Sequence, residues 1–561
     1  MDIEKQIKTE IEKFFSNLGV EVKDEEIILT ASDKREHGDY ATNIALRKAK
    51  ALGMKPIDLA TKIASSFKLD GVDKAEACMP GFLNFFLKQD ELGSIIKKII
   101  DEKENYGNLD IGKGKKVDVE YVSANPTGLL HLGHARGAAL GDCIARLYKK
   151  SGYDVTREYY INDAGNQINN LGLSLIARYK EQFGQECTFP EDGYHGEEIT
   201  ELAIKLKEEV GDKYLKDPES NLEFFKKYGS DNLLERIKED LHEFRVDQDV
   251  YTSEKAIRNR GDVEKVLERL KPYCYVQDEA TFLDTKKDGD DKDRVLIKSD
   301  GSYTYLLPDI AYHADKFSRG FDLVVDLFGA DHHGYVTRLK SAVKDLGYNP
   351  DSVQVALVQM VRLFKDGEEF KMSKRTGNAI SMKELMDEVG VDSCRYFFVS
   401  RSANSHLDFD IDLAKKLGSE NPVYYAQYTH ARLCGIMNNG KAFYPVDYKA
   451  DRLSSEPEKN LLIAMKDFPT VIKTATYENE PYKITNYVHS LAMLINEFYS
   501  KCRVLDDSDV DLSRQRLGLV EACKVVLADA LDLIAVSAPE RMTSDDKVKE
   551  DASDSSTAKE N

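Results

Sequence analysis

The chain lacks several patterns that define common protein classes. No run of about 20 apolar residues occurs, so no membrane-spanning helix is expected, and the amphipathic start MDIEKQIKTEIEKFF does not resemble a signal peptide. The eight cysteines form no CxxC pair and have no histidine at metal-ligand spacing, which argues against a zinc site and favours reduced thiols. We therefore expect a cytoplasmic protein without membrane contact and without a metal site built from its own side chains.

Nucleotide-binding glycine patterns are also missing. No GxGxxG or GxxxxGK[ST] stands at a strand–helix junction, which argues against a dinucleotide enzyme or a P-loop NTPase. The net charge of −20 argues against a nucleic-acid binder as a whole, so an RNA partner would need local basic faces. A length of 561 residues predicts several domains.

Residues 117–148 predict a strand, a tight loop and a helix, because alternating apolar residues give way to Pro and Gly and then to helical spacing. His131, Gly133 and His134 stand at the predicted helix start. A helix N-terminus offers unpaired N–H groups and a positive dipole end, which suits a phosphate. A histidine there can also be only a cap, so this motif alone leaves both interpretations open.

A second segment strengthens the phosphate interpretation. Lys371 and Lys374 lie on a polar loop, FKMSKRTGN, and mobile ammonium groups suit a triphosphate leaving group. Together the two segments resemble the HIGH and KMSKS motifs of class I aminoacyl-tRNA synthetases, written here as HLGH and KMSKR.

Longer runs narrow this resemblance to the arginyl-tRNA synthetase family. The similar runs are EYVSANPTGLLHLGHARG from residue 120, DRVLIKSDGSYTYLLPDIAYH from 293, GADHHG from 329, NPVYYAQY from 421 and SAPERM from 537. The resemblance covers the chain to about residue 542.

The resemblance implies an α/β fold: a Rossmann-like class I catalytic domain with an α+β N-terminal domain and an all-helical C-terminal anticodon-binding domain. We expect an additional tRNA-binding domain at 1–112, the catalytic domain at 113–415 with a helical insertion at about 165–268, the anticodon-binding domain at 416–542, and a disordered acidic tail at 543–561. The tail has too few apolar residues to order itself.

The implied reaction has two steps. Arginine attacks the α-phosphate of ATP to give arginyl-adenylate, and the 3′ end of tRNA(Arg) then takes the arginyl group. The catalytic residues implied are His131, His134, Lys371 and Lys374; the ATP-binding residues are His131, Gly133, His134, Gly329, Asp331 and Lys374. Mg²⁺ would balance the triphosphate charge. The family generally activates arginine only with tRNA bound, which we carry over as an expectation.

Selecting L-arginine requires carboxylates, because a guanidinium is a planar fork of donors. The resemblance implies the arginine-binding residues Glu120, Asn125, Tyr305, Asp309 and His332. Asp309 could instead be a dipole-stabilising first-turn acid and Asn125 a turn former, and both readings stay open.

Contacts to tRNA are the least defined expectation. Asn84 in the N-terminal domain and Tyr424 and Tyr428 in the C-terminal domain could meet or stack on bases, although packing roles are the simpler interpretation. A monomer is the expected state. Two alternatives remain: a synthetase for another amino acid such as lysine, and a non-catalytic RNA-binding paralogue with the same fold.

Overall fold

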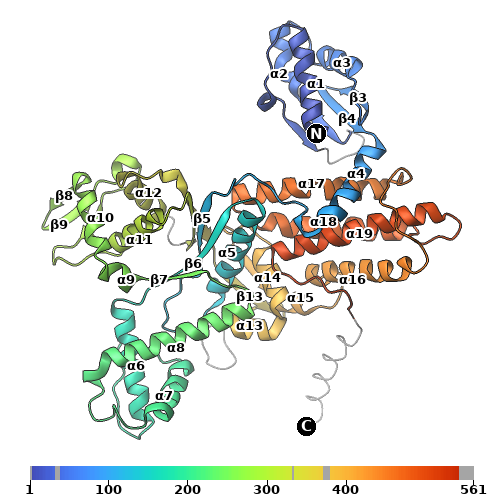
Figure 1. Ribbon diagram of the computed structural model, residues 1–561. Helices are drawn as coiled ribbons and strands as arrows, with labels where there is room; N and C mark the ends of the chain where they lie inside the picture. Colours follow the sequence, from blue (N-terminus) through green and yellow to red (C-terminus); the bar gives the residue numbers. More distant parts are fainter. Residues whose placement is uncertain (1–2, 32–37, 331–333, 371–379, 543–561) are drawn as a thin grey trace. The chain divides into compact units, whose positions relative to one another are not determined.

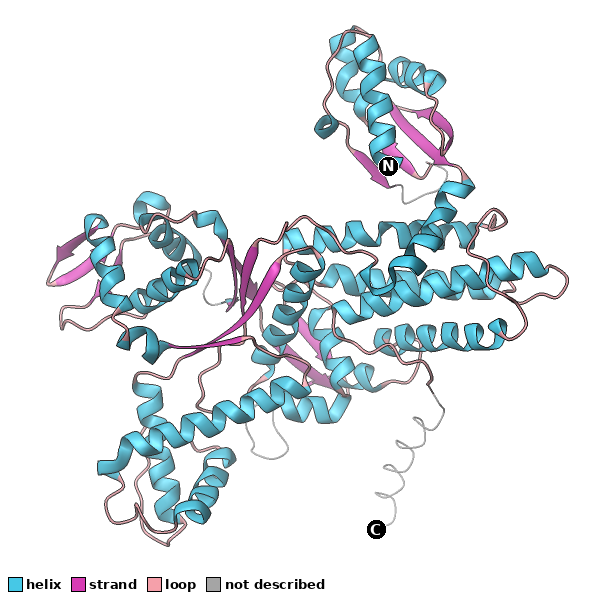
Figure 2. Cartoon of the chain, in the orientation of Figure 1, coloured by secondary structure: helices cyan, strands magenta, loops and turns pink. Residues whose placement is uncertain are grey.

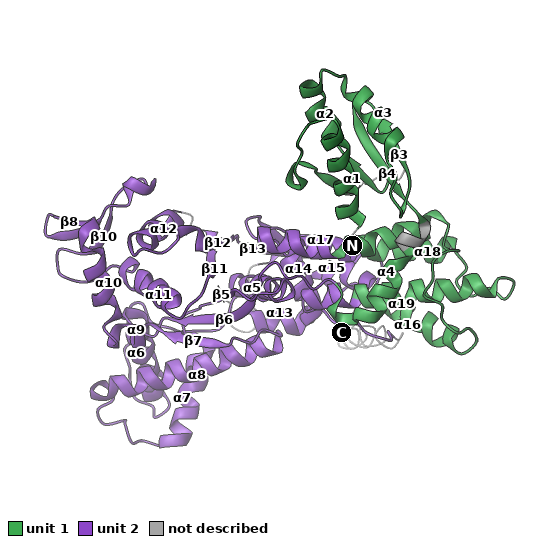
Figure 3. Ribbon diagram, turned by 45° about the horizontal axis from the view of Figure 1, so that its top comes forward, with its two compact units in different colours: residues 1–106, 429–468, 490–527 green, residues 107–428, 469–489, 528–561 purple. Residues whose placement is uncertain are grey.

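The computed structural model describes residues 3–31, 38–330, 334–370 and 380–542 of the chain. It divides into two compact units (Figure 3). The first comprises Met1–Tyr106, Thr429–Phe468 and Ser490–Leu527, and the second comprises Gly107–Tyr428, Pro469–His489 and Ala528–Asn561. The predicted tail, 543–561, lies outside the described residues.

The N-terminal part of the first unit is α+β, as expected (Figure 1). Its elements are α1 (Ile3–Asn17), β1 (Leu29–Ala31), β2 (Tyr40–Thr42), α2 (Ile44–Lys48), α3 (Pro56–Ser66), β3 (Val72–Cys78), β4 (Phe82–Leu87) and α4 (Gln89–Glu102). The strands form one antiparallel sheet in the order β1-β2-β4-β3. The amphipathic start of the chain forms α1, which buries Ile7 and Ile11; Leu18 follows the end of the helix at Asn17 and is exposed.

The C-terminal part of the chain is helical, as expected. Its helices are α16 (Pro422–Lys441), α17 (Glu456–Glu478), α18 (Tyr482–Lys501) and α19 (Val510–Leu533), and they supply residues to both units. Within the first unit, the hydroxyl of Tyr106 donates to the carbonyl of Met465 at 2.7 Å, so the N-terminal segment packs on residues from late in the chain.

The second unit is built on a five-stranded parallel sheet (Figure 2). Its strands are β5 (Lys116–Glu120), β6 (Asp154–Ile161), β7 (Val250–Ser253), β11 (Leu323–Gly329) and β12 (Val353–Val358), in the order β12-β11-β5-β6-β7. The sheet lies between α5 (Leu132–Lys150) on one face and α11 (Leu306–Ser318) and α12 (Tyr335–Asp345) on the other (Figure 1). This is the doubly wound arrangement in which ligands bind at the carboxyl ends of the strands.

The range predicted as a helical insertion, 165–268, is helical except for one strand. It contains α6 (Asn166–Glu181), α7 (Glu197–Val210) and α8 (Leu222–Glu243), then α9 (Glu254–Asn259) and α10 (Asp262–Leu270). Between α8 and α9, however, β7 pairs in parallel with β6 and forms an edge of the central sheet. Four half-buried residues are too short a run for hydrophobic alternation to reveal a strand.

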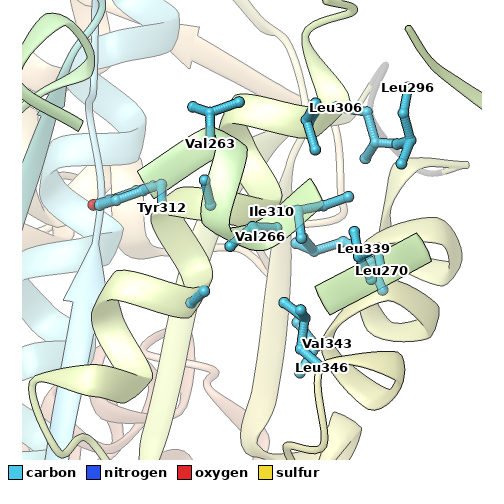
Figure 4. Packing of buried hydrophobic residues seen from close by; sticks show 14 of the residues in the cluster. Val263, Val266, Leu270, Leu296, Leu306, Ile310, Tyr312, Leu339, Val343 and Leu346 are labelled. Atoms are coloured by element: carbon cyan, nitrogen blue, oxygen red, sulfur yellow. The ribbon is translucent and has the colours of Figure 1, made fainter. Parts of the chain in front are cut away.

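Three antiparallel strands that the sequence did not reveal follow α10. They are β8 (Cys274–Gln277), β9 (Ala280–Leu283) and β10 (Arg294–Ile297). Helices α10, α11 and α12 bury Val263, Val266, Ile310, Leu339 and Val343 in a common core (Figure 4). This core holds α11 beside the central sheet.

A third small sheet contains the residues that directly precede the KMSKR motif. Its strands are β13 (Val361–Lys365), β14 (Glu368–Phe370) and β15 (Leu407–Asp410), and the nearby helices are α13 (Met382–Val389), α14 (Val391–Val399) and α15 (Ile411–Lys415). Across the described ranges, no helix has the length and apolarity needed to cross a membrane.

Candidate active site

The loop between β5 and α5 ends in a cap made by two histidines. The backbone N–H of Gly133 donates to Nδ1 of His131 at 3.1 Å, and the backbone N–H of His131 donates to Nδ1 of His134 at 3.3 Å. The pair is a reciprocal capping box in which imidazole replaces the usual hydroxyl and carboxyl groups. The helix begins at Leu132, as predicted. Both histidines cap the helix through Nδ1, so the cap interpretation is correct for this nitrogen of each ring.

This cap fixes which nitrogen of each ring carries a proton. Because each Nδ1 accepts a backbone N–H, the proton of each neutral ring sits on Nε2, which can donate to a ligand. Burial lowers the pKa of His131, and burial together with the neighbouring His131 lowers the pKa of His134 to about 3. The rings stack with centroids 3.7 Å apart. The helix start therefore offers two neutral N–H donors at neutral pH.

The packing around Gly133 also favours glycine at this position, apart from any approach of a ligand. A Cβ at this position would lie 3.0 Å from Cε1 of His131 and 3.2 Å from its Nδ1. A side chain here would press on the ring that caps the helix, so glycine lets His131 keep its orientation.

The loop that precedes the cap holds strained backbone. Val122 and Ser123 have φ values of 71° and 40°, in the left-handed region that β-branched residues rarely adopt. The turn brings Oγ of Ser123 to Oε1 of Glu120, to which it donates at 2.9 Å, while the same Oγ accepts from the backbone N–H of Tyr160 at 3.0 Å. The strain therefore orients the carboxylate at the end of β5.

Lys371 and Lys374 lie outside the described residues, but the chain that leaves their segment is anchored at the first motif. Ser381 forms an antiparallel bridge with His131, and the N–H of Met382 donates to the carbonyl of Leu130 at 2.7 Å. Ser381 also caps α13, accepting from the N–H of Glu384 at 3.1 Å. The described chain after the second motif therefore runs beside the capping histidines at Ser381 and Met382.

A cavity of about 540 Å³ opens beside this anchor, entirely within the second unit. It is lined by the first motif, by the insertion helices and by the start of α13, including Asn125, Thr127, His131, His134, Glu198, Glu201, Asp240, Ser381 and Lys383. Burial raises the pKa of Asp240 in this acidic wall to about 6. The side-chain nitrogen of Asn125 donates to Oε1 of Gln167, so its amide is oriented by α6.

A buried ion cluster lies under the carboxyl ends of β5 and β11. Lys316 of α11 is fully buried, and its Nζ donates to Oε2 of Glu120 at 2.6 Å and to Oδ1 of Asp326 at 2.8 Å. Its Nζ also lies 3.0 Å from Oδ2 of Asp118. Burial raises the pKa of Glu120, which remains 7% exposed at the edge of the cluster.

Asp309 lies about two turns before Lys316 on α11. Burial and a hydrogen bond with Asp309 raise the pKa of Tyr335, and burial with the nearby Glu254 and Asp309 raises that of Tyr160. Two tyrosine hydroxyls therefore border the Asp309 carboxylate. The sequence missed both tyrosines, although Tyr160 stands at the carboxyl end of β6, where ligands of such sheets bind.

The remaining predicted residues lie in varied surroundings. Tyr305, directly before α11, is 86% exposed, and its carbonyl accepts from the backbone N–H of Asp309 at 3.4 Å. Gly329 ends β11, and the neighbouring Asp331 and His332 lie outside the described residues. The structure thus brings Glu120 and Asp309 into one ion network, and Asn125, His131 and His134 around one cavity.

The predicted tRNA contacts are elsewhere in the chain. Asn84 is only 5% exposed within β4, which is the burial of a core residue. Tyr424 and Tyr428 are one turn apart on α16, and their rings stack with centroids 5.9 Å apart. Tyr428 has an exposed side chain and Tyr424 a half-buried one.

Comparison with known families agrees with the sequence resemblance over nearly the whole chain. The "Arginyl tRNA synthetase N terminal domain" model matches residues 1–87, the "tRNA synthetases class I (R), catalytic domain" model matches 95–404, and the "DALR anticodon binding domain" model matches 426–542.

Individual relatives show the same pattern. The chain is 46% identical to a protein named arginine–tRNA ligase from Bacillus licheniformis over 96% of this chain and 98% of the relative. It is 49% identical to arginine–tRNA ligase 1 of Halalkalibacterium halodurans over 92% of this chain and 94% of the relative. The Thermus thermophilus arginyl-tRNA synthetase structure shares the fold, with a TM-score of 0.75 at 21% identity, covering 96% of this chain and 100% of that one. The chain belongs to the arginyl-tRNA synthetase family of class I.

Proposed function

We propose that this chain is an arginine–tRNA ligase, which activates L-arginine with ATP and transfers it to the 3′ end of tRNA(Arg). The family membership supports the reaction as a whole. The observation that supports the proposal at the site is the bridge between His131 and Ser381, because it holds the described chain that follows the second motif at the first motif. The sheet edge is also where ligands of this architecture bind.

ATP is bound and polarised by groups at this point. The Nε2–H groups of His131 and His134 donate to the phosphates as charge develops on them, and Lys371 and Lys374 hold the departing pyrophosphate. Gly133 keeps the cap in place, and Gly329 allows the nucleotide to lie against the end of β11. Asp331 accepts hydrogen bonds from the ribose hydroxyls. These roles fit a step in which positioning and charge stabilisation do most of the work.

Arginine is bound by the carboxylates at the ends of β5 and α11. Asp309 accepts the guanidinium, with Tyr305 and His332 beside the side chain, while Glu120 and Asn125 contact the amino acid end. The fixed orientation of Glu120, held by Ser123 and Lys316, favours a site that is formed before substrate arrives.

Magnesium is proposed as an ion carried by the triphosphate rather than by a cage of side chains. Among the residues that the structure describes, no group of three or more His, Cys, Asp or Glu side chains is arranged to hold a metal. Mg²⁺ commonly keeps its waters and binds substrate phosphates, so the ATP complex supplies its ligands.

The finer assignments complete the proposal. We place the tRNA-binding domain at 1–112, the catalytic domain at 113–415 and the anticodon-binding domain at 416–542. Asn84, Tyr424 and Tyr428 contact tRNA, and the enzyme works as a cytoplasmic monomer. Since Asn84 is buried in the unbound chain, its contact requires a local rearrangement on binding.

The decisive experiment is arginine-dependent ATP–pyrophosphate exchange by the purified chain, with and without total tRNA, with lysine and cysteine as controls. Exchange with arginine alone among the amino acids supports the proposal, and dependence on tRNA supports the gated mechanism. Exchange with lysine instead would reassign the substrate. No exchange with any amino acid, while tRNA still binds, would favour the non-catalytic RNA-binding alternative.

A further inference from the structure

The two carboxylates proposed to bind arginine are joined by a continuous buried relay. Glu120 accepts from Lys316, Lys316 also donates to Oδ1 of Asp326, and Oδ2 of Asp326 lies 2.9 Å from Nε2 of His313. Nδ1 of His313 lies 2.9 Å from the carbonyl oxygen of Asp309 and 3.3 Å from its Oδ1. His313, Lys316 and Asp326 are all fully buried.

The hydrogen-bond partners of His313 define its charge. The backbone carbonyl of Asp309 can only accept, so Nδ1 must carry a proton. The carboxylate of Asp326 already accepts from Lys316, which keeps it ionised, so Nε2 donates to it as well. Burial alone would lower the pKa of His313, but Asp326 and Asp309 raise it well above its usual range. His313 is therefore an imidazolium held between two acidic residues.

One face of α11 supplies the cations of this relay. Asp309, His313 and Lys316 stand at positions i, i+4 and i+7, so their side chains lie along the same stripe of the helix. Asp326 comes from β11 and Glu120 from the neighbouring β5, where the two residues are paired in register. The helix and the two strands therefore fix the spacing between Asp309 and Glu120.

A purely structural role would be a costly use of these groups. Well-packed apolar residues of similar volume often stabilise a protein as well as, or better than, a buried ion cluster. The acids also outnumber the cations. Burial raises the pKa of Asp118, which lies beside Lys316, to about 8.

Resting on the proposed function, we propose that His313 and Lys316 are positioning residues for arginine: His313 orients Asp309, Lys316 orients Glu120, and Asp326 holds both cations. Neither touches the substrate. Their removal weakens arginine binding through the carboxylates and leaves ATP binding nearly unchanged.

The test is a double-mutant cycle read in the exchange assay at saturating ATP and tRNA. His313→Gln should raise the KM for arginine by about tenfold to hundredfold, the effect of losing hydrogen bonds to a charged group. The KM for ATP should stay within about twofold, and thermal melting should show a folded protein. If His313 acts through Asp309, the Asp309→Asn, His313→Gln double variant should match Asp309→Asn alone within about twofold.

A second double-mutant cycle tests whether Lys316 orients Glu120. Lys316→Gln in the Glu120→Gln background removes both partners of a buried bond, which is less damaging than removing one. It should add little to the arginine KM of Glu120→Gln alone. The matched control is His242→Gln, because His242 is an exposed histidine that pairs with Asp247 at 2.7 Å on the surface, and its loss should not change the KM for arginine.

The outcomes separate the relay from the underlying function. If the wild-type enzyme shows no arginine-dependent exchange, the proposed function fails. If it exchanges, and Asp309→Asn raises the KM for arginine while folded His313→Gln does not, only the relay is refuted. The relay would also be refuted if the rise in the arginine KM of the double variant equalled the product of the rises in the two single variants. Should His313→Gln not fold, Asp326→Asn takes its place, and a normal KM for arginine in that folded variant would overturn the proposal.

Discussion

His131 and Ser381 form an antiparallel bridge although they come from opposite halves of the catalytic part of the chain. His131 caps α5 and Ser381 caps α13, so a single contact joins two helix starts. The described chain that follows the second motif is therefore held at the first motif from Ser381 onward.

Ser381→Ala should weaken ATP handling more than arginine binding. Loss of the cap should cost about 1 kcal/mol of stability and loosen the start of α13 where it meets the first motif. We expect a higher KM for ATP in the exchange assay with a KM for arginine near normal. Asn349→Ala is the control, since Asn349 also caps a short helical turn, with Oδ1 accepting from Asp351 at 3.1 Å. An equal rise in both KM values, or none, would contradict the anchoring role.

Lys374→Ala should slow adenylate formation strongly and leave folding intact. Removing a group that stabilises the leaving pyrophosphate commonly costs about 100-fold to 1,000-fold in rate. Single-turnover formation of arginyl-adenylate measures the effect, and a thermal melt checks the fold. Lys97→Ala, at an exposed helix lysine paired with Asp101, should behave like the wild type. Near-normal rates for Lys374→Ala would refute its role.

His134 should make stability fall on acidification. Its pKa is lowered to about 3 in the folded chain, below its ordinary value of 6.5, so the unfolded chain binds the extra proton more readily. Its contribution is complete above about pH 6.5 and is lost as the pH falls from there towards 3. Melting temperatures of wild type and His134→Asn between pH 8 and pH 4 test this. The wild type should lose more stability than the variant, and parallel curves would argue against a neutral His134.

Arg136→Met should be strongly destabilising. This fully buried guanidinium donates to the carbonyls of Gln359, Ser402 and Ser405 at 2.7 to 2.9 Å, tying α5 to the chain around β13 and β15. Losing these part-buried bonds leaves three carbonyl acceptors without their donor, at up to about 1 to 3 kcal/mol each. Denaturant unfolding should show a loss of at least about 3 kcal/mol. Arg503→Met, at an exposed arginine with one such bond, should lose much less.

Val122→Gly should stabilise the chain while impairing the site. Glycine accepts the φ of 71° without strain, and relief of such strain is worth about 1 kcal/mol or more. The freer turn should orient Ser123 and Glu120 less well, raising the KM for arginine. Val122→Ala separates the loss of side-chain packing from the backbone effect. A less stable Val122→Gly variant would show that the turn is not a source of strain.

Sequence patterns predicted the helices and strands whose apolar residues recur at a regular spacing. They missed features that depend on packing partners far away in the sequence. The strand, loop and helix predicted within residues 117–148 are found as β5 and α5, because their apolar residues follow the periods of a strand and a helix. The short strand β7 was missed because four half-buried residues show no period. Lys316 and His313 were missed for a different reason: charged residues on a helix resemble a solvated face, and only the strand acids across from α11 show that this face is buried.

The pairing of Glu120 with Asp326 also imposes an order on biosynthesis. Roughly 200 residues separate these neighbours, so a ribosome needs about 10 to 40 seconds to make the second after the first. During that interval the emerging chain has β5 and β6 but neither Lys316 nor β11, so its acidic strand end has no buried cation to pair with. The ion cluster of the catalytic sheet therefore cannot form until α11 and β11 have been made.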